Sequence, residues 1–312
     1  MTKACAPGKI ILLGEHAVVY GRPALAVPVR QVQACARIEP AGDGAPGGVL
    51  LVSAGTALHA WLDELPAEHP LAAICRATLA ALAISEFAPL RLSIESTIPV
   101  ASGLGSSAAV SVAVARALNQ HFGGSLRDGD ISDLAYEVER IHHGTPSGID
   151  NTVVSFDRPV LFQRGERPVP LAIGGTFTFL IADTGIAAPT AEAVGLVRQR
   201  WSADPARLEA AFDEIAAIVL DGRQALQNGD HHALGQAMRR NHGALVGLGV
   251  SSVELDRLVQ AAEASGALGA KMSGGGMGGH MIALVGAPER DAVAASLNAA
   301  GAASLLRSEV GP

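Results

Sequence analysis

A run of small residues in front of an apolar helix is the feature of this sequence that most restricts its fold. Residues 102–108 read SGLGSSA, and the apolar segment that follows, to about Phe122, has the pattern of an α-helix. Most helices begin with a single capping Ser, Thr, Asp or Asn, whereas here the backbone is almost bare. Free N–H groups at a helix N-terminus, together with the helix dipole, favour an anion such as a di- or triphosphate. The predicted phosphate-binding residues are Gly103, Leu104, Gly105, Ser106, Ser107 and Ala108.

The same loop also fits the G-x-G-x-x-A fingerprint of dinucleotide-binding proteins. That fingerprint requires a tight turn directly after a strand and an acidic residue closing a second strand about 20 residues on. Here residues 98–102 come between strand and loop, and a break with a second helical pattern follows the helix. No Lys-Ser or Lys-Thr pair ends the loop, so it is not a Walker A sequence either. A nicotinamide-dependent oxidoreductase therefore stays open only as a less favoured alternative.

Two further glycine-bearing segments lie near the two ends of the chain. In APGKIILLGEHAVVYG, residues 6–21, a Pro-Gly turn precedes Lys9 at the expected start of a strand. Glu15 and His16 form a polar pair at the far end of that strand. In KMSGGGMGGHMIALV, residues 271–285, a G-x-G-x-x-G pattern runs directly into a strand, which is not dinucleotide-binding geometry.

Lysine is rare in this chain and occurs only at Lys3, Lys9 and Lys271, while arginine supplies all the other positive charge. Lys9 and Lys271 both lie beside glycine-bearing loops. They are therefore candidates for sites that need a compact ammonium group instead of a guanidinium fork.

Two acids flank the segment ERIHHGTPSGIDN. Glu139 lies near the end of a predicted helix, and Asp150 follows a Pro-Ser-Gly turn and is predicted to open an apolar strand. An acid at the mouth of a buried strand is unfavourable unless it has a partner or a task. With a phosphate loop, an acid for Mg²⁺, a second acid for an acceptor hydroxyl and a lysine, the chain holds the groups that phosphoryl transfer needs.

Composition narrows the class of protein further. The 312 residues are 49% hydrophobic and carry a net charge of −7, which argues against a nucleic-acid-binding protein. The N-terminus lacks the features of a signal peptide, and no apolar run reaches the ~18 residues of a membrane span. Three widely spaced cysteines, Cys5, Cys35 and Cys75, fit no metal pattern and indicate a reduced setting. We expect a cytoplasmic globular protein.

Strand and helix patterns alternate through both halves of the chain, which predicts an α+β protein. The Pro-, Gly- and Arg-rich stretch at 157–175 favours a domain boundary, so we predict domains over residues 1–165 and 166–312. Helical patterns are expected near 71–84, 191–201, 205–227, 231–248, 253–265 and 289–298.

Taken together, the motifs resemble those of the GHMP small-molecule kinases. The motifs are APGKIILLGEHAVVYG, SGLGSSAA, HGTPSGIDN and KMSGGGMGG, in that order along nearly the whole chain. GEHAVVYG, HGTPSGID and NHGALVGLGVSS favour the members that phosphorylate mevalonate. The resemblance implies a two-domain fold with an N-terminal domain like domain 2 of ribosomal protein S5, a ferredoxin-like C-terminal domain and an active site between them. It also implies a homodimer, while the composition predicts no membrane or nucleic-acid partners.

The reaction implied is ATP- and Mg²⁺-dependent phosphorylation of the C5 hydroxyl of (R)-mevalonate in isoprenoid biosynthesis. By the resemblance, Asp150 is the base toward that hydroxyl, and Lys9 keeps Asp150 ionised and polarises the hydroxyl. Glu139 and Ser107 would hold Mg²⁺, although Ser106 is an alternative to Ser107. The implied ATP contacts are the phosphate loop and Gly274, Gly275 and Gly276, and the implied substrate contacts are Glu15 and His16.

The sequence departs from the family pattern at two places. Met277 stands in the last glycine loop where a small residue or an arginine is common, and APTAEAV lacks a basic residue often found after its Thr. A GHMP kinase for another acceptor, such as phosphomevalonate or a sugar, is therefore an alternative, although no cluster of basic residues near the motifs favours a phosphorylated acceptor. A nucleotide-binding module without catalysis is disfavoured because Lys9 and Asp150 are both present.

Overall fold

Two long neighbouring strands, β1 (Thr2–Leu13) and β2 (Ala24–Pro40), contribute residues to both compact units of the chain. The first unit comprises Met1–Gly8, Val32–Val100 and Gly105–Asp157, and the second comprises Lys9–Gln31, Ala101–Leu104 and Arg158–Pro312. The structure is a computed structural model that describes residues 1–42, 45, 47–99, 103–143, 146–187 and 190–311, with the backbone alone for residues 142 and 143.

The sheet of the first unit is built on the second half of β2. β5 (Leu90–Ser96) pairs antiparallel with it and β3 (Val49–Ser53) lies parallel to β5, while β4 (Leu58–Trp61) forms the edge. Along β5 the residues at 90, 92 and 94 are buried leucines and an isoleucine, whereas Arg91 between them is exposed. The alternation in the sequence therefore marks a strand with one face on the core.

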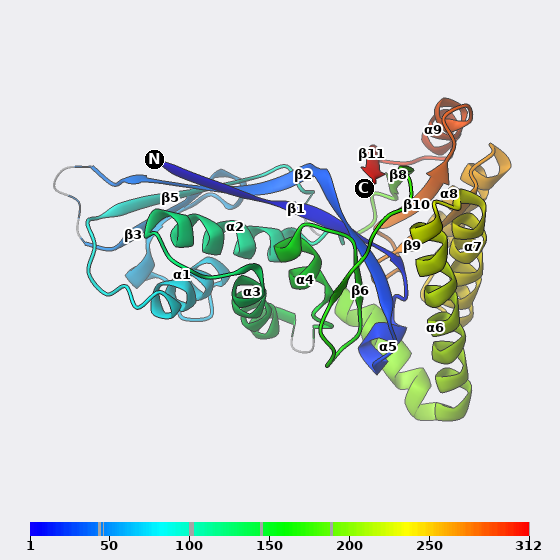
Figure 1. The fold of residues 1–312 in the computed structure, drawn as a ribbon, viewed down its shortest axis with the longest axis horizontal. Coiled ribbons are helices and arrows are strands. Elements are labelled where there is room, and N and C mark those ends of the chain that lie inside the picture. Colours follow the sequence, from blue (N-terminus) through cyan, green and yellow to red (C-terminus); the bar gives the residue numbers. More distant parts are fainter. Residues whose placement is uncertain (43–44, 46, 100–102, 144–145, 188–189, 312) are drawn as a thin grey trace. The chain divides into compact units, whose positions relative to one another are not determined.

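Four helices of the first unit lie on one face of this sheet (Figure 1). They are α1 (Pro70–Ala81), α2 (Ser106–His121), α3 (Asp128–His143) and α4 (Ile149–Phe156). α2 packs against the other three, and its small side chains at 108–118 are almost all buried. Alanine and valine at these positions let the helices approach closely, because little side-chain volume separates them.

A disulfide joins Cys5 in β1 to Cys35 in β2. The wide spacing of the cysteines in the sequence did not predict this pair. The expectation of reduced cysteines is therefore wrong for Cys5 and Cys35 in this structure. Pairing of the two strands brings together residues that are 30 positions apart. Cys75 is free and buried in α1.

The second unit contains a four-stranded antiparallel sheet in the order β11-β8-β10-β9. The strands are β8 (Phe177–Asp183), β9 (Gly269–Ser273), β10 (His280–Val285) and β11 (Ser304–Val310). In the hairpin of β9 and β10, Ser273 lies opposite His280, so residues 274–279 form the connecting loop. Every residue of these two strands is buried, which anchors both ends of the glycine loop.

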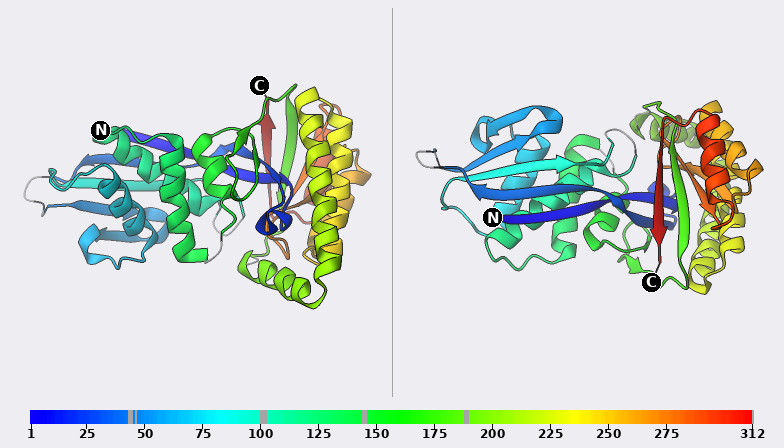
Figure 2. Two further views of the ribbon diagram at one scale, coloured as in Figure 1. Left: turned by 60° about the horizontal axis from the view of Figure 1, so that its bottom comes forward. Right: turned by 90° about the horizontal axis from the view of Figure 1, so that it is seen from above.

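Helices of the second unit cover one face of this sheet (Figures 1 and 2). They are α6 (Pro205–Asn228), α7 (His231–Leu248), α8 (Val253–Ala264) and α9 (Arg290–Ala299), while α5 (Thr190–Ala203) packs against α6. Asp204, Asp230 and Ser252 cap α6, α7 and α8 by accepting a hydrogen bond from a backbone N–H three residues on. The helices predicted in this half are confirmed to within a few residues, and the mixture of sheets and helices confirms the α+β class.

Short elements complete the description. β6 (Val160–Phe162) pairs with the first part of β2, and β7 (Val169–Pro170) pairs with β6, so the Pro- and Gly-rich stretch at 157–175 carries a small hairpin. Single turns are η1 (Ala17–Tyr20), η2 (Ala54–Thr56) and η3 (Leu62–Glu64). Within the described ranges, none of the helices has the length and apolar character needed to span a bilayer.

Candidate active site

The predicted phosphate loop leads directly into α2. Gly103 and Gly105 have φ of 75° and 76°, a region that glycine adopts without steric cost, and Gly105 is the N-cap. Because Gly105 has no side chain, no capping group occupies the first N–H groups of the helix. Ser107 is exposed and Ser106 is half-buried, whereas Ser102 lies outside the described residues. The start of α2 thus has the form that anion binding requires.

Asp150 occupies the first turn of α4, after Gly148 with φ of 91°. The prediction that Asp150 opens a strand is therefore wrong, although NTVVSF has the β-branched content of one. Thr152 Oγ1 donates to the carbonyl of Gly148 at 2.7 Å, and Asn151 Nδ2 donates to Ser132 Oγ at 2.9 Å. These bonds favour the helical turn and tie it to α3, and the helix dipole stabilises a carboxylate in the first turn. Gly144 and Thr145 of the preceding motif lie outside the described residues.

Glu139 lies on α3 and is 6% exposed, which confirms its predicted place near the end of a helix. α3 packs against both α2 and α4, so Glu139, Asp150 and the start of α2 belong to one helical cluster of the first unit. Arg116 of α2 fastens this cluster because its guanidinium donates to the carbonyl of Ser155 at 2.6 Å. No sequence signal singled out Arg116, since a helical arginine is ordinarily on the surface.

Lys9 is the eighth residue of β1, a strand of 12 residues, and is 3% exposed. The prediction that Pro7 and Gly8 form a turn before the strand is wrong, because both residues lie within β1. The backbone N–H of Lys9 donates to the carbonyl of Leu104 at 2.9 Å. This bond attaches the strand that carries Lys9 to the first part of the phosphate loop within the second unit.

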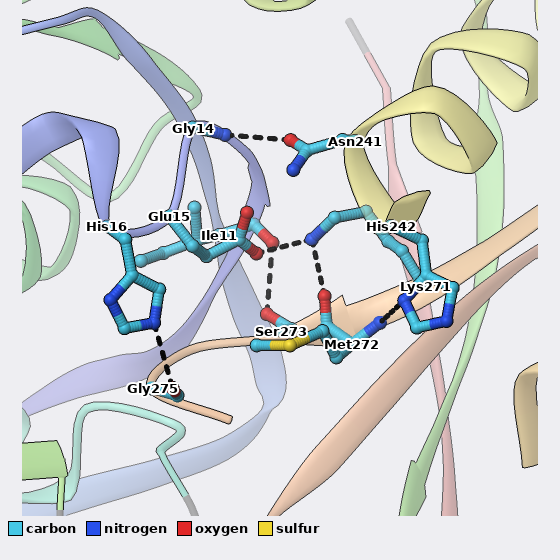
Figure 3. Close-up of polar contacts among 10 residues, drawn as sticks. All are labelled: Ile11, Gly14, Glu15, His16, Asn241, His242, Lys271, Met272, Ser273 and Gly275. Atoms are coloured by element: carbon cyan, nitrogen blue, oxygen red, sulfur yellow. Dashed lines mark hydrogen bonds and ion pairs between the residues drawn. The ribbon is translucent and has the colours of Figure 1, made fainter. Parts of the chain in front are cut away.

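A buried ion pair joins the end of β1 to β9 in the second unit. Lys271 Nζ donates to the Glu15 carboxylate and to the carbonyl of Met272 (Figure 3). Lys271 is 0% exposed and Glu15 is 1% exposed. Burial raises the pKa of the Glu15 carboxyl and lowers the pKa of the Lys271 ammonium, and the attraction between the two opposes both effects.

His16 lies beside this pair and contacts the glycine loop. Its Nε2 is 2.8 Å from the carbonyl oxygen of Gly275 (Figure 3). Burial lowers the pKa of His16 to about 4. The hydrogen bond to Gly275 raises this pKa, whereas the positive charge of Lys271 lowers it further. A carbonyl only accepts, so the neutral ring carries its proton on Nε2 and leaves Nδ1 as an acceptor. His16 also has φ of 61°, which is rare outside glycine.

Replacing His16 with Asn is expected to remove a pH-dependent part of the stability. Between pH 6.5 and 4 the unfolded chain binds a proton at His16 that the folded chain does not, so the wild type loses stability as the pH falls. Asn is among the residues most often found at positive φ. Relative to the variant, the wild-type free energy of unfolding should be about 2 kcal/mol smaller at pH 5 than at pH 7.5. Urea titrations at the two pH values measure this, and an unchanged difference would contradict the assignment. Titrations of Glu15 and Lys271 are common to both proteins.

The glycine loop is held by backbone contacts along its length. Gly274 and Gly276 have φ of 91° and 85°, and Met277 has φ of 61°. The N–H of Met277 donates to the carbonyl of Val250 at 2.8 Å, and the N–H of Gly279 donates to that of Ile186 at 2.8 Å. The loop is therefore a fixed turn between two strands and not a flexible connection.

The structure brings the predicted residues together in two sets. Glu139, Asp150 and the start of α2 lie in the first unit, and Glu15, His16, Lys9 and the loop at 274–276 lie in the second. Sequence analysis missed Asn241, whose Oδ1 accepts from the N–H of Gly14 at 3.0 Å (Figure 3). Among the described residues, no group of three or more His, Cys, Asp or Glu lies close enough to hold a metal ion.

The family of the chain follows from comparison with known proteins. The family described as "GHMP kinases N terminal domain" matches residues 69–157, and "GHMP kinases C terminal" matches residues 223–303. The N-terminal match includes the phosphate loop, Glu139 and Asp150, and the C-terminal match includes the glycine loop. Fold and motifs therefore define a GHMP kinase, and the α+β prediction for a two-domain protein of this type is confirmed.

Full-length relatives identify the branch of the family. Mevalonate kinase of Aeropyrum pernix is 35% identical over 90% of this chain and 88% of its own length. Mevalonate kinase of Pyrococcus horikoshii is 33% identical over 97% of this chain and 94% of its own length. The crystal structure of L. major mevalonate kinase in complex with R-mevalonate is 31% identical and covers 100% of this chain and 96% of its own, with a TM-score of 0.85. The chain belongs to the mevalonate kinases within the GHMP kinase family.

Proposed function

We propose that this chain transfers the γ-phosphoryl group of ATP to the C5 hydroxyl of (R)-mevalonate, which gives 5-phosphomevalonate and ADP. The observation that carries the proposal is likeness over nearly the full chain to mevalonate kinases, one of them solved with R-mevalonate bound. The four motifs that predicted this activity also support the proposal, because they occur in order along nearly the whole chain.

Asp150 is proposed as the group that accepts the proton of the C5 hydroxyl. The hydroxyl oxygen then attacks the γ-phosphorus, the bond to the bridging oxygen of ADP breaks, and the proton remains on the Asp150 carboxylate. A base within hydrogen-bond reach typically contributes about 10² to 10⁴ in rate. Lys9 is proposed to polarise this hydroxyl. Nδ1 of the neutral His16 ring can accept a hydrogen bond from a different hydroxyl of mevalonate. Glu15 is proposed to line the mevalonate-binding site beside His16.

The ATP phosphates are proposed to bind the N–H groups at the start of α2. Support comes from the left-handed Gly103 and Gly105 and from the absence of a capping side chain at Gly105. Residues 103–108 form this cradle, and Gly274, Gly275 and Gly276 are proposed to brace the nucleotide as well. Such preorganised N–H groups stabilise the negative charge of the transferring phosphoryl group without reorganisation.

The residues predicted to hold Mg²⁺ fit that ion chemically. A carboxylate and a hydroxyl are the hard oxygen ligands that Mg²⁺ prefers, and one or two protein ligands with substrate phosphates are usual for it. Glu139 and Ser107 supply this pair on packed helices, α3 and α2, and Ser106 remains the alternative hydroxyl. Bound Mg²⁺ neutralises charge on the phosphates.

Replacing Glu139 with Gln is expected to raise the Mg²⁺ concentration for half-maximal rate by about tenfold or more, because an amide is a weaker ligand than a carboxylate. Initial rates at fixed ATP and increasing MgCl₂ measure the shift. Glu137→Gln is the matched control, since Glu137 is exposed on the same helix and pairs with Arg140. Equal Mg²⁺ dependence in wild type and Glu139→Gln would remove Glu139 from the metal site.

An acceptor panel separates the proposal from its alternatives. ADP release with Mg-ATP is measured with (R)-mevalonate, phosphomevalonate and galactose, and the highest kcat/KM is expected with (R)-mevalonate. A higher value with another acceptor would keep the kinase and replace the substrate. An NADH titration without a fluorescence change is expected and removes the oxidoreductase alternative. Tight ATP binding without turnover on any acceptor would favour a non-catalytic module.

Several finer predictions accompany the proposal. A cytoplasmic location, a homodimer, a role in isoprenoid and lipid metabolism, and the absence of membrane and nucleic-acid partners stay predictions. The division into domains over residues 1–165 and 166–312 likewise stays a prediction. Size-exclusion chromatography with light scattering measures the oligomeric state directly.

A further inference from the structure

Lys271 is a buried charge that the proposed chemistry does not use. It lies in β9, three residues before Gly274, and its ammonium donates to the Glu15 carboxylate and to the carbonyl of Met272 (Figure 3). Its partner Glu15 directly precedes His16, which contacts the carbonyl of Gly275. One ammonium therefore connects the strand that enters the glycine loop with the turn that follows β1.

Stability alone does not account for this ion pair. Removing two charges from water is unfavourable, and apolar residues of similar volume are often neutral or stabilising in place of a buried pair. Moreover, Glu15 Oε2 is buried and has no hydrogen-bond partner within standard geometry among the described residues, although backbone hydrogen bonds from Gly274 and Glu15 lower the pKa of the carboxyl. What the pair supplies beyond apolar packing is a defined position for the two segments that it joins.

The glycine loop needs such positioning because it has almost no side chains of its own. Between Gly274 and Gly279 the only side chain belongs to Met277, which is 39% exposed. The loop therefore offers few side chains for apolar packing, and polar contacts contribute to its position. One such contact is the 2.8 Å bond between His16 and Gly275, and His16 is held at a positive φ of 61° beside Glu15.

Two further hydrogen bonds attach β1 and the turn after it to β9 and α7. Ser273 Oγ donates to the carbonyl of Ile11 at 2.9 Å, and the N–H of Gly14 donates to Asn241 at 3.0 Å. Asn241 is 0% exposed and comes from α7. The Glu15–His16 turn is thus attached to β9 and α7, and Lys271 adds a buried positive charge paired with Glu15.

We propose that Lys271 is a positioning residue for phosphoryl transfer. Through Glu15 it fixes the turn that carries His16, and through His16 it fixes the carbonyl of Gly275, so the glycine loop is preorganised for the nucleotide. The inference rests on the proposed function of that loop. A compact ammonium suits this fully buried place, whereas the fork of an arginine needs more volume and more acceptors.

A double-mutant cycle tests the proposal. Glu15→Gln and Lys271→Met are each expected to lower kcat by about tenfold or more. If Lys271 acts through Glu15, the double variant should have the kcat of Glu15→Gln to within about threefold, and losses that multiply would overturn the proposal. Lys3→Met, at an exposed lysine, is the matched control and should keep the wild-type kcat.

Thermal unfolding separates positioning from stability in the same proteins. Lys271→Met leaves a buried carboxylate without its cation and should unfold at a lower temperature, whereas the double variant should recover most of the loss. Low kcat in a double variant with near-wild-type stability supports the proposal. Wild-type kcat in that variant would show that the pair is only structural.

Calorimetric titration with Mg-ADP makes the test independent of the acceptor. Lys271→Met is expected to bind Mg-ADP at least about threefold more weakly than the wild type, because the loop is no longer preorganised. If the wild type fails to phosphorylate mevalonate but this difference in Mg-ADP affinity is present, the proposed substrate fails and the positioning role stands. Equal Mg-ADP affinity and equal kcat in wild type and Lys271→Met would overturn the role of Lys271.

Discussion

Replacing Asp150 with Asn is expected to lower kcat by about 10²- to 10⁴-fold while the protein remains folded. Asn has the shape of Asp and can orient a hydroxyl, but its amide cannot take the proton. The neighbours that hold this turn are unaffected, since Thr152 bonds the carbonyl of Gly148 and Asn151 bonds Ser132. Coupled ADP release at saturating Mg-ATP and mevalonate measures kcat, and calorimetry with Mg-ADP is expected to show unchanged nucleotide binding.

Asp157→Asn is the matched control for this experiment. Asp157 is the C-cap of the same helix, with φ of 46°, a conformation that Asn also tolerates. The control should keep kcat within about twofold, because it lies at the opposite end of α4 from the proposed base. A kcat close to wild type in Asp150→Asn would show that the carboxylate is not needed to accept the proton. A loss near tenfold would indicate that it mainly orients the hydroxyl.

Replacing Gly276 with Ala is expected to disrupt the glycine loop much more than the same change at Gly274. A Cβ at Gly276 would lie 2.0 Å from the carbonyl oxygen of Val250, a backbone atom that cannot rotate away. A Cβ at Gly274 would meet no atom within 4 Å. Both residues have positive φ, so both variants carry a conformational cost of about 1 to 2 kcal/mol.

The two alanine variants therefore separate steric overlap from backbone strain. Gly274→Ala should lower the free energy of unfolding by the conformational cost alone, and Gly276→Ala should lower it by at least about 2 kcal/mol more. Thermal unfolding followed by circular dichroism measures both. Similar losses in the two variants would mean that the carbonyl of Val250 does not constrain the loop. The expected kcat is also lower in Gly276→Ala, because the displaced loop no longer braces the nucleotide.

Local patterns in the sequence predicted where several of the candidate site segments lie in the fold. A bare loop followed by an apolar helix requires only neighbouring residues to be recognised, and α2 follows the loop and ends at His121, close to the predicted end near Phe122. For the same reason the sequence predicted that the glycine loop leads into a strand, and β10 starts at His280 directly after it. The alternation in β5 likewise identified a half-buried strand.

Where local pattern and context compete, the sequence was misleading. The β-branched run after Asp150 favours a strand, but Thr152 and Asn151 find hydrogen-bond partners that favour a helical turn. Pro7 and Gly8 ordinarily mark a turn, but pairing of β1 with β2 keeps them in a strand. Contacts between distant residues left no local signal: Lys271 and Glu15 are 256 positions apart, and only the scarcity of lysine drew attention to Lys271.

Phosphorus NMR of the reaction product tests the central claim most directly. The purified protein is incubated with Mg-ATP and (R)-mevalonate, and the spectrum is recorded as ADP accumulates. The proposed function predicts one new phosphomonoester, coupled to the C5 methylene protons and equal in amount to the ADP formed, and none without mevalonate. A phosphorylated product at another hydroxyl, or ADP formed together with inorganic phosphate alone, would contradict it.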